Sequence, residues 1–242
     1  MKFYRRLSPI KAISFDLDDT LYSNKPVMLA IAKKMIGYFA KHYPNQTQPL
    51  DQRFWSPFRR LAIRQQPDLA HDVVQVRLVC YRLGLMSLGL SEKAAQQQAQ
   101  AALDYFIQLR SDFTVPESSK MLLASLAEKY PLVAISNGNV DTQALELSQY
   151  FKHIYHAGWQ NDGRLLKQKP ASDMFTVACE KLAIKSSQLL HVGDCGRSDI
   201  QGALNAGCQA VWLSCYDVGK PITVLPHVEI TAVNQLVQLL ID

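Results

Sequence analysis

The chain has 242 residues, of which 48% are hydrophobic and 19% charged, and this composition is typical of a globular protein with a buried core. Its formal net charge of +5 suits a small anionic ligand but is too mild for a nucleic-acid interface, which needs Lys and Arg clustered on one face. No segment approaches the roughly 20 apolar residues of a membrane span, and the basic N-terminus reaches Asp16 too early for a signal peptide.

The cysteines indicate a reducing compartment. There are five of them, an odd number, and none has the paired spacing of metal ligands. Three lie in apolar runs, so we expect reduced and mostly structural thiols. We therefore expect a cytoplasmic protein that binds neither nucleic acid nor membranes.

The N-terminal part of the chain changes from a strand pattern to a helical pattern at about residue 22. Residues 2–11 hold the densest basic patch, which we interpret as a solvated tail, and residues 12–15 are an apolar run typical of a buried strand. Helices are then predicted over 26–42, 51–65, 69–88 and 91–109. Successive helices without an intervening strand indicate a separate bundle.

Strand and helix patterns alternate from about residue 112 onward. Strands are predicted at 132–135, 153–156, 188–192 and 209–213. Helices are predicted at 116–129, 141–150, 172–182, 197–206 and 232–240. Apolar strands separated by helices indicate an α/β fold with a Rossmann-like parallel sheet covered on both faces. We expect this core to comprise residues 1–22 and 112–242, with a four-helix domain inserted at 23–111.

The segment Asp16-Leu17-Asp18-Asp19-Thr20 follows the first strand directly. An unpaired buried carboxylate costs several kcal/mol, so an acidic cluster at a strand end needs a metal ion, a cation or a reaction. Period-two alternation turns Asp16 and Asp18 to one side and Leu17 into the core. One carboxylate can then attack while the other handles protons. A polar turn is the alternative, and we assign that role to Asp19 alone.

Polar residues also follow the later strands, where ligands bind in open parallel sheets. Ser136-Asn137-Gly138 follows the second strand and precedes a predicted helix, whose free amide groups would favour an anion. Lys169 lies in a loop ahead of the next helix, and Asp194 follows a further strand, with Asp199 five positions later. Each signal alone has a structural alternative: a helix cap or turn for Ser136 and Asn137, a surface residue for Lys169, and an exposed acidic residue in the first helical turn for Asp199.

In this order, the four groups of residues resemble the motifs of the haloacid dehalogenase superfamily. The resemblance covers the whole chain, because one cap type of that superfamily is a helical insertion just after the first motif. It implies that Asp16 is a nucleophile that forms an aspartyl-phosphate and that Asp18 is the general acid and base. It also implies a Mg²⁺ ion held by the Asp16 and Asp194 carboxylates and the Asp18 main-chain carbonyl.

The resemblance assigns the remaining site residues to the phosphoryl group. Ser136 and the Asn137 amide would hold its oxygens, and Lys169 would neutralise charge on the nucleophile and on the phosphoryl group. Cations are required because a dianionic phosphate is repelled by an anionic nucleophile. Thr20 and Asp199 would support the site. Many relatives carry a second carboxylate directly after the Gly-Asp pair, and here that position is Cys195, which puts the fine geometry of the metal site in question.

The expected activity is hydrolysis of a small phosphomonoester with Mg²⁺. Further segments resemble the bacterial phosphatase group that acts on flavin mononucleotide and on 5-amino-6-(5-phospho-D-ribitylamino)uracil, among them His71-Asp72-Val73 in the helical insertion. Alternatives are a phosphatase of other sugar phosphates or nucleotides, a phosphomutase, a haloacid dehalogenase or a non-catalytic binding protein. Asp18 argues against the dehalogenase, whose relatives lack that residue.

Two tryptophans could stack on a substrate ring, but burial in the core is our interpretation of both Trp55 and Trp159. Most charged residues of the insertion are interpreted as solvated faces or pairs within the bundle, and one or two would close over a substrate.

Overall fold

The structure is a computed structural model that describes residues 1–215 and 219–240; the remaining positions, all in the predicted core domain, lie outside the described residues. The chain divides into two compact units. An α/β unit comprises Met1–Lys25, Thr114–Gly138 and Thr142–Asp242, and a helical unit comprises Pro26–Phe113 and Asn139–Asp141. Each has a hydrophobic core of its own.

Seven strands of the described residues form one sheet in the α/β unit, in the order β1-β9-β8-β7-β2-β3-β4. All neighbours are parallel except β1 and β9. The strands are β1 (Lys2–Phe3), β2 (Ala12–Phe15), β3 (Leu132–Ser136), β4 (His153–His156), β7 (Leu189–Gly193), β8 (Gln209–Leu213) and β9 (Val228–Ile230). The central strands are buried along their whole length, as expected for a parallel sheet covered on both faces.

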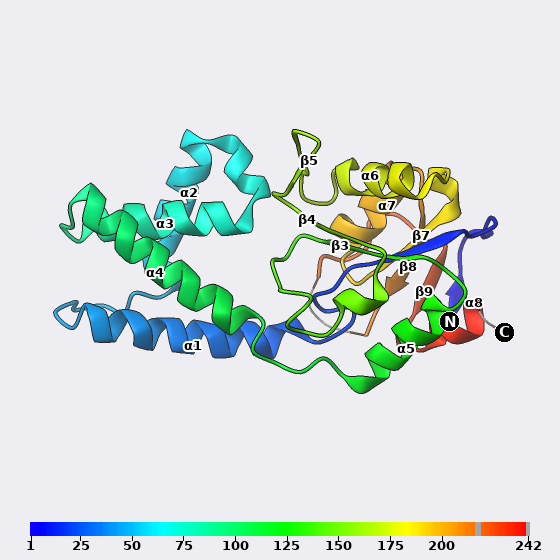
Figure 1. Cartoon of the computed structure of the whole chain (residues 1–242), viewed down its shortest axis with the longest axis horizontal. Coiled ribbons are helices and arrows are strands. Elements are labelled where there is room, and N and C mark those ends of the chain that lie inside the picture. Colours follow the sequence, from blue (N-terminus) through cyan, green and yellow to red (C-terminus); the bar gives the residue numbers. More distant parts are fainter. Residues whose placement is uncertain (216–218, 241–242) are drawn as a thin grey trace. The chain divides into compact units, whose positions relative to one another are not determined.

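Helices cover the two faces of this sheet (Figure 1). α6 (Asp173–Leu182) and α7 (Gly202–Asn205) lie on one face, and α5 (Glu117–Ala127) and α8 (Gln235–Leu240) lie on the other. Shorter segments complete the unit: the 3₁₀ turns η2 (Ser148–Tyr150) and η3 (Ser186–Gln188), the π-helical segment η4 (Gly196–Gln201), and a small hairpin of β5 (Gln160–Asn161) and β6 (Arg164–Leu165). This architecture confirms the predicted α/β class.

The helical unit contains α1 (Asn24–His42), α2 (Gln52–Gln65), the 3₁₀ turn η1 (Pro67–His71), α3 (Val73–Ser87) and α4 (Glu92–Arg110). Side-chain caps set several of its helix ends: Asp51 accepts the main-chain N–H groups of Arg53 and Phe54 at the start of α2, and Ser91 accepts that of Ala94 at the start of α4. An aromatic cluster that includes Trp55 fills the space between the helices. Trp55 is half-buried and packs against the core of the helical unit, so its predicted packing is confirmed in part.

The predicted helix over 69–88 is interrupted at Asp72. Its Oδ1 accepts the main-chain N–H groups of Val74 and Gln75, both at 2.9 Å, and so caps α3 after a separate 3₁₀ turn. In a continuous helix over 69–88, the Asp72 carboxylate would not cap a helix start. The sequence prediction overlooked Asp72 as a cap because the apolar pattern runs through it.

The predicted helix over 141–150 is wrong. The chain makes one helical turn that ends at Glu146, whose φ of 57° is left-handed. The N–H of Glu146 donates to Gln143 and that of Leu147 to Thr142, at 2.9 and 2.8 Å, which is the pattern of a Schellman motif. Only η2 follows. Helical periodicity over so short a stretch does not show where a left-handed residue stops the helix.

The N-terminus is not a solvated tail, because Lys2 and Phe3 form the edge strand β1. Lys2 lies opposite Glu229 of β9, and its Nζ pairs with the Glu229 carboxylate at 3.3 Å. Tyr4 also donates to that carboxylate at 2.6 Å.

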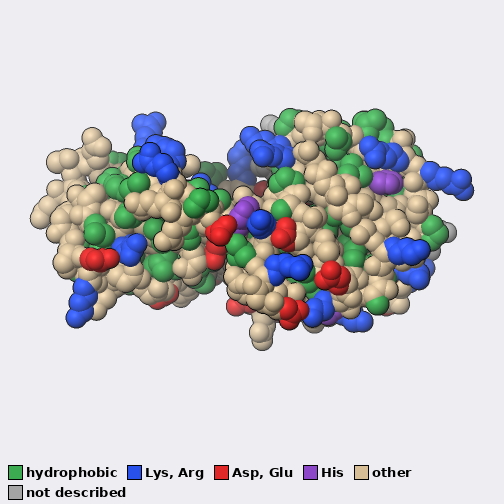
Figure 2. Space-filling view, turned by 90° about the horizontal axis from the view of Figure 1, so that it is seen from above, with side chains coloured by type: hydrophobic (Ala, Val, Ile, Leu, Met, Phe, Trp, Pro, Cys, Tyr) green, Lys and Arg blue, Asp and Glu red, His purple; other side chains and the backbone are tan. Residues whose placement is uncertain are grey.

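On the face shown in Figure 2, the basic side chains are spread out and acidic side chains lie among them.

Two further features of the surface bear on the sequence predictions. Trp159 is 52% exposed, so the prediction of a buried tryptophan is wrong there; its ring contacts only that of His156 among the described aromatic pairs. Within the described residues, none of the helices has the length and apolar character needed to cross a membrane.

Candidate active site

Three neighbouring parallel strands bring the predicted site residues to one edge of the sheet. β2 lies between β3 and β7, so the chain connections around it run in opposite directions. Such switch points are where ligands bind in open α/β sheets. Asp16 follows β2, Ser136 ends β3, and Asp194 follows β7.

Lys169 reaches Asp16 from the loop before α6. Its Nζ donates to Asp16 Oδ1 at 2.8 Å, to Asp199 Oδ1 at 2.6 Å and to the Ile135 carbonyl at 2.7 Å. These contacts use all three N–H groups of the ammonium, which is buried. Burial alone would lower the pKa of Lys169, but the carboxylates of Asp16 and Asp199 raise it. Lys169 is therefore a fixed positive charge beside Asp16 and not a surface lysine.

Asp199 lies inside the protein, in η4, and not on an exposed helical turn. Its Oδ1 also lies 3.3 Å from His191 Nε2, and its Oδ2 accepts the main-chain N–H of Cys195 at 2.9 Å. Burial alone would raise the pKa of Asp199, but Lys169 and the hydrogen bond from His191 lower it below its usual range. π-helical segments occur frequently at functional sites, and here one carries this carboxylate to Lys169.

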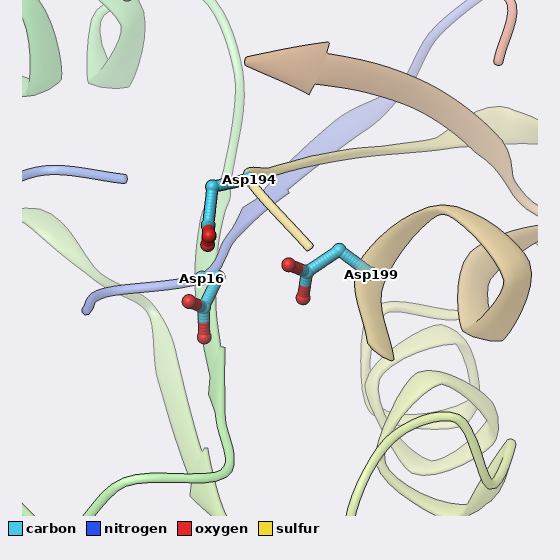
Figure 3. A group of neighbouring side chains, drawn as sticks. All are labelled: Asp16, Asp194 and Asp199. Atoms are coloured by element: carbon cyan, nitrogen blue, oxygen red, sulfur yellow. The ribbon is translucent and has the colours of Figure 1, made fainter. Parts of the chain in front are cut away.

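The carboxyl groups of Asp16, Asp194 and Asp199 gather at the end of β2 (Figure 3). One carboxylate oxygen from each lies within 4.8 Å of the others. Burial, followed by repulsion from neighbouring carboxylates, raises the pKa of Asp194 to about 7, and burial raises that of Asp16 well above its usual value despite Lys169. Among the described cationic side chains, Lys169 alone contacts this pair, at Asp16, and it offsets the burial and repulsion of the Asp16 and Asp194 carboxyls only in part.

This donor set fits a Mg²⁺ ion, which prefers carboxylate and carbonyl oxygens. Asp16 and Asp194 are the stronger candidates for direct ligands, because the two oxygens of Asp199 are already held by Lys169, His191 and Cys195. A cation at Asp16 and Asp194 would stabilise their ionised forms against the burial and the repulsion that raise their pKa values.

Asp18 lies beside the Ser136–Gly138 loop. Tyr22, which is buried, donates its hydroxyl to Asp18 Oδ1 at 2.8 Å. A Cβ atom at Gly138 would stand 2.4 Å from Asp18 Oδ2, so only glycine allows this approach. Asp18 is also close enough to Asp16 to raise the pKa of the Asp16 carboxyl. The two aspartates that the sequence singled out therefore share one end of the sheet.

The loop at Ser136 is held by its own polar groups. Ser136 Oγ accepts the N–H of Gly138 at 3.0 Å, which leaves the hydroxyl hydrogen for another acceptor. The Asn137 side chain accepts from Lys169 N at 2.7 Å and donates to Lys169 O at 3.0 Å. Asn137 therefore uses its side-chain amide to hold the backbone of Lys169, and its main-chain N–H is the amide that remains for a ligand.

The helix expected to follow this loop is absent, so its free amide groups do not contribute to anion binding here. The chain instead makes the short turn that ends at Glu146. Binding of an anion would depend on Ser136, on local main-chain N–H groups and on cations.

Asp19 and Thr20 of the first motif and Cys195 next to Asp194 lie around the carboxylate cluster. Asp19 is left-handed, with φ 58°, and accepts the N–H of Asn24 at 2.8 Å at the start of α1, which confirms it as a turn residue. Thr20 is buried, and its hydroxyl has no hydrogen-bond partner within the described part of the chain. Cys195 caps η4, since its Sγ accepts the N–H groups of Ser198 and Lys220 at 3.5 and 3.3 Å. Its thiol thus holds the loop next to Asp194.

The sequence analysis missed the residues that hold the charged groups in place. Ser14 and His191 lie on β2 and β7, where strand periodicity predicts only packing. Tyr22 holds Asp18, and His156 Nδ1 lies 2.8 Å from the Gly138 carbonyl oxygen. Trp212 Nε1 donates to the Asp194 carbonyl oxygen at 2.7 Å. The signal that could have revealed some of these residues is the presence of two polar side chains, Ser14 and His191, within buried strands.

Comparison with known proteins extends these observations. Residues 10–207 match the family model described as haloacid dehalogenase-like hydrolase. The 5-amino-6-(5-phospho-D-ribitylamino)uracil phosphatase YigB of Escherichia coli (strain K12) is 36% identical over 249 residues, which cover 99% of this chain and 100% of that protein. The N-acylneuraminate-9-phosphatase of Homo sapiens is 27% identical over 97% of this chain and 95% of that protein.

Solved structures share the same architecture. A crystal structure described as 2-haloacid dehalogenase from Pseudomonas syringae pv. Tomato DC3000 superposes with a TM-score of 0.86 at 28% identity, covering 96% of this chain and 98% of that chain. The magnesium-bound putative HAD-hydrolase YfnB from Bacillus subtilis, with a TM-score of 0.68 at 18% identity over 97% and 100%, shows the shared fold.

The parallel sheet with helices on both faces and carboxylates gathered at its switch point defines a protein of the α/β class. The chain belongs to the haloacid dehalogenase-like hydrolase family, and it is a phosphatase of that family.

Proposed function

We propose that the protein hydrolyses a small phosphomonoester through an aspartyl-phosphate at Asp16. The observation that carries this proposal is the contact of Asp16 with the fixed ammonium of Lys169, in a cluster with Asp194 and next to Asp18. A carboxylate held against one cation and next to a further carboxylate is suited to attack an anionic phosphoryl group once a second cation is present.

The reaction has two steps. The Asp16 carboxylate attacks phosphorus, and the bond to the leaving oxygen breaks as Asp18 gives that oxygen a proton. Asp18 then takes a proton from water, whose oxygen attacks phosphorus and releases inorganic phosphate and free Asp16. The Ser136 hydroxyl and the Asn137 N–H would bind the phosphoryl oxygens. Thr20 and Asp199 would support the site.

Mg²⁺ would be held by the carboxylates of Asp16 and Asp194 and by the Asp18 carbonyl, and it would supply charge neutralisation for the phosphoryl group. Lys169 would supply the remaining positive charge through Asp16, because its own N–H groups are occupied by protein acceptors.

The proposed substrate is flavin mononucleotide or 5-amino-6-(5-phospho-D-ribitylamino)uracil, both of which carry a ribityl 5-phosphate. The name of the Escherichia coli relative supports this choice. We also propose that residues 23–111 form the cap domain that selects the leaving group for a core of residues 1–22 and 112–242. We place the reaction in the cytoplasm, which agrees with the five free cysteines.

A haloacid dehalogenase is the second candidate, since a structural relative carries that name. The presence of Asp18 favours the phosphatase, because displacement of a halide needs no proton donor at that position. A phosphomutase would keep both aspartates and would differ in returning the phosphoryl group to a substrate.

The test is phosphate release from a panel that includes both ribityl phosphates, other sugar phosphates and nucleotides, with and without Mg²⁺, and chloride release from 2-chloropropionate. We expect phosphate release that requires Mg²⁺, and Asp16→Asn should lower kcat more than about 1000-fold because the nucleophile is removed. The control is Asp162→Asn, which changes an exposed carboxylate of the same unit. A fully active Asp16→Asn would contradict the mechanism, and inactivity on every ribityl phosphate would contradict the substrate.

A further inference from the structure

Five buried polar groups are joined in series by four hydrogen bonds that end at Asp16. Ser14 Oγ lies 2.9 Å from His191 Nδ1, and His191 Nε2 lies 3.3 Å from Asp199 Oδ1. Asp199 contacts Lys169 at 2.6 Å, and Lys169 contacts Asp16 at 2.8 Å. Ser14 lies on β2 and Asp16 directly follows that strand, so the series begins and ends at the same part of the sheet. We call these five residues the buried polar series.

The geometry fixes how protons are arranged in the series. The Asp199 carboxylate, in contact with the Lys169 ammonium, can only accept hydrogen bonds. His191 Nε2 must therefore carry a hydrogen that it donates to Asp199. In the neutral imidazole, Nδ1 is then an acceptor, so the Ser14 hydroxyl must donate to it. Asp199 thus sets the tautomer of His191, and the Ser14 hydroxyl satisfies the Nδ1 acceptor of that tautomer.

The location of these residues is unusual for a parallel sheet. Ser14 and His191 are paired neighbours on the central strands β2 and β7, and both are completely buried. The edge-on ring of Phe175 packs against His191 with centroids 4.9 Å apart. Apolar side chains would fill these positions without the desolvation that a buried hydroxyl and imidazole require.

The structure assigns His191 the role of a positioning residue that acts on Asp16 through Asp199 and Lys169. His191 fixes the Asp199 carboxylate from the side opposite Cys195, Asp199 fixes the Lys169 ammonium, and the ammonium orients one oxygen of Asp16. Outer-sphere hydrogen bonds of this kind set the orientation and basicity of charged groups that act directly. The inference rests on the proposed function, because it concerns the same nucleophile.

Three variants separate positioning from packing. His191→Leu keeps an apolar side chain in the core but removes the donor to Asp199. His191→Gln places an amide N–H near the position of the imidazole Nε2 and should restore that donor. Ser14→Ala removes the hydroxyl that donates to His191 Nδ1 and holds the ring from its other side. The control is Val177→Ala, which destabilises the same core from α6 without touching the series.

We expect His191→Leu to lower kcat by about 10–100-fold with KM within about twofold of wild type, because the nucleophile is displaced and the substrate contacts are kept. His191→Gln should recover most of kcat, Ser14→Ala should lie between them, and Val177→Ala should match wild type. A His191→Leu kcat near that of wild type, or a folded Gln variant no better than Leu, would overturn the inference. If His191→Leu does not fold, an unchanged kcat in Ser14→Ala overturns it.

A second readout does not depend on turnover. The Lys169 ammonium should give a slowly exchanging side-chain ¹⁵N–H signal in the wild-type protein, because its three donors are buried and bonded. That signal should be lost in His191→Leu and kept in His191→Gln and Val177→Ala. A signal unchanged in His191→Leu would overturn the inference even if the protein hydrolyses none of the tested phosphates, an outcome that would separately contradict the proposed function.

Discussion

At the residue scale, Asp16, Asp194 and Asp199 place three carboxyl groups together with the Lys169 ammonium in direct contact with two of them. Lys169 lowers the pKa of Asp199, whereas burial raises those of Asp16 and Asp194. The cluster therefore divides into Asp199, whose carboxylate is ionised against Lys169, and Asp16 and Asp194, whose ionised forms are disfavoured by burial and repulsion. This difference is what the proposed cation at Asp16 and Asp194 would remove.

This difference predicts how the stability of the metal-free protein depends on pH. Asp194 has a pKa of about 7 when folded and about 4 when unfolded, so between these values the folded state binds a proton that the unfolded state does not. The free energy of unfolding should therefore fall as pH rises from about 4 to about 7. Thermal denaturation in EDTA should show this decline in wild type and a smaller one in Asp194→Asn. Equal declines in both proteins would contradict the assignment.

The sequence predicted the charged residues of the site better than the residues that hold them. Asp16, Asp194 and Lys169 follow strands or precede a helix, and parallel strands bring such positions together. Whether Asp199 was exposed could not be read from its position, because its burial depends on η4 and on Gly193, where a Cβ atom would meet the Asp199 carboxylate at 2.3 Å. His191 was missed because its partners come from three separate segments.

At the element scale, the loop after β3 is held by hydrogen bonds and is not followed by the helix that the sequence predicted. Ser136, Asn137 and Gly138 are fixed by hydrogen bonds to one another, to Lys169 and to His156. The loop is therefore rigid through side-chain contacts and not through helical continuation. Its closeness to Asp18 depends on the missing side chain of Gly138.

We predict that Gly138→Ala displaces Asp18 and lowers activity. The new Cβ would lie 2.4 Å from Asp18 Oδ2, so the carboxylate or the loop must shift, and displacements of about 1 Å can cost about 100-fold in rate. Steady-state kinetics on the best phosphomonoester would measure the loss. The matched control is Gly37→Ala in α1, where a Cβ atom meets nothing within 4 Å and should stabilise the helix by about 0.5–1 kcal/mol. A Gly138→Ala variant as active as this control would contradict the proposed closeness.

The accuracy with which the sequence predicts strands and helices differs between elements for a physical reason. β2, β4 and β8 have the predicted bounds, because buried apolar runs end sharply at polar residues. β1 and β9 were missed, since a short edge pair depends on partners distant in the chain. The error at 141–150 depends on a single left-handed residue, Glu146, which is a residue type with no marked preference for that conformation.

At the scale of the whole molecule, the helical and α/β units each have a core that the other does not supply. Aromatic packing around Trp55 stabilises the helical unit, and strand pairing with flanking helices stabilises the α/β unit. The carboxylates of the site all belong to the α/β unit. Ligand binding at these carboxylates and packing of the helices can therefore be changed separately by mutation.

This division predicts two unfolding transitions in calorimetry. Leu85→Ala removes a fully buried side chain from α3 and Leu126→Ala removes one from α5, and each should destabilise its own unit by about 2–5 kcal/mol. Mg²⁺ at about 100 times its Kd should raise the free energy of unfolding of the α/β unit by about 2.7 kcal/mol. The reason is that, under the proposed function, the ion binds the folded site and not the unfolded chain. The Mg²⁺-sensitive transition should thus shift in Leu126→Ala and stay in place in Leu85→Ala. A single transition that both variants lower equally would show that the two units unfold together.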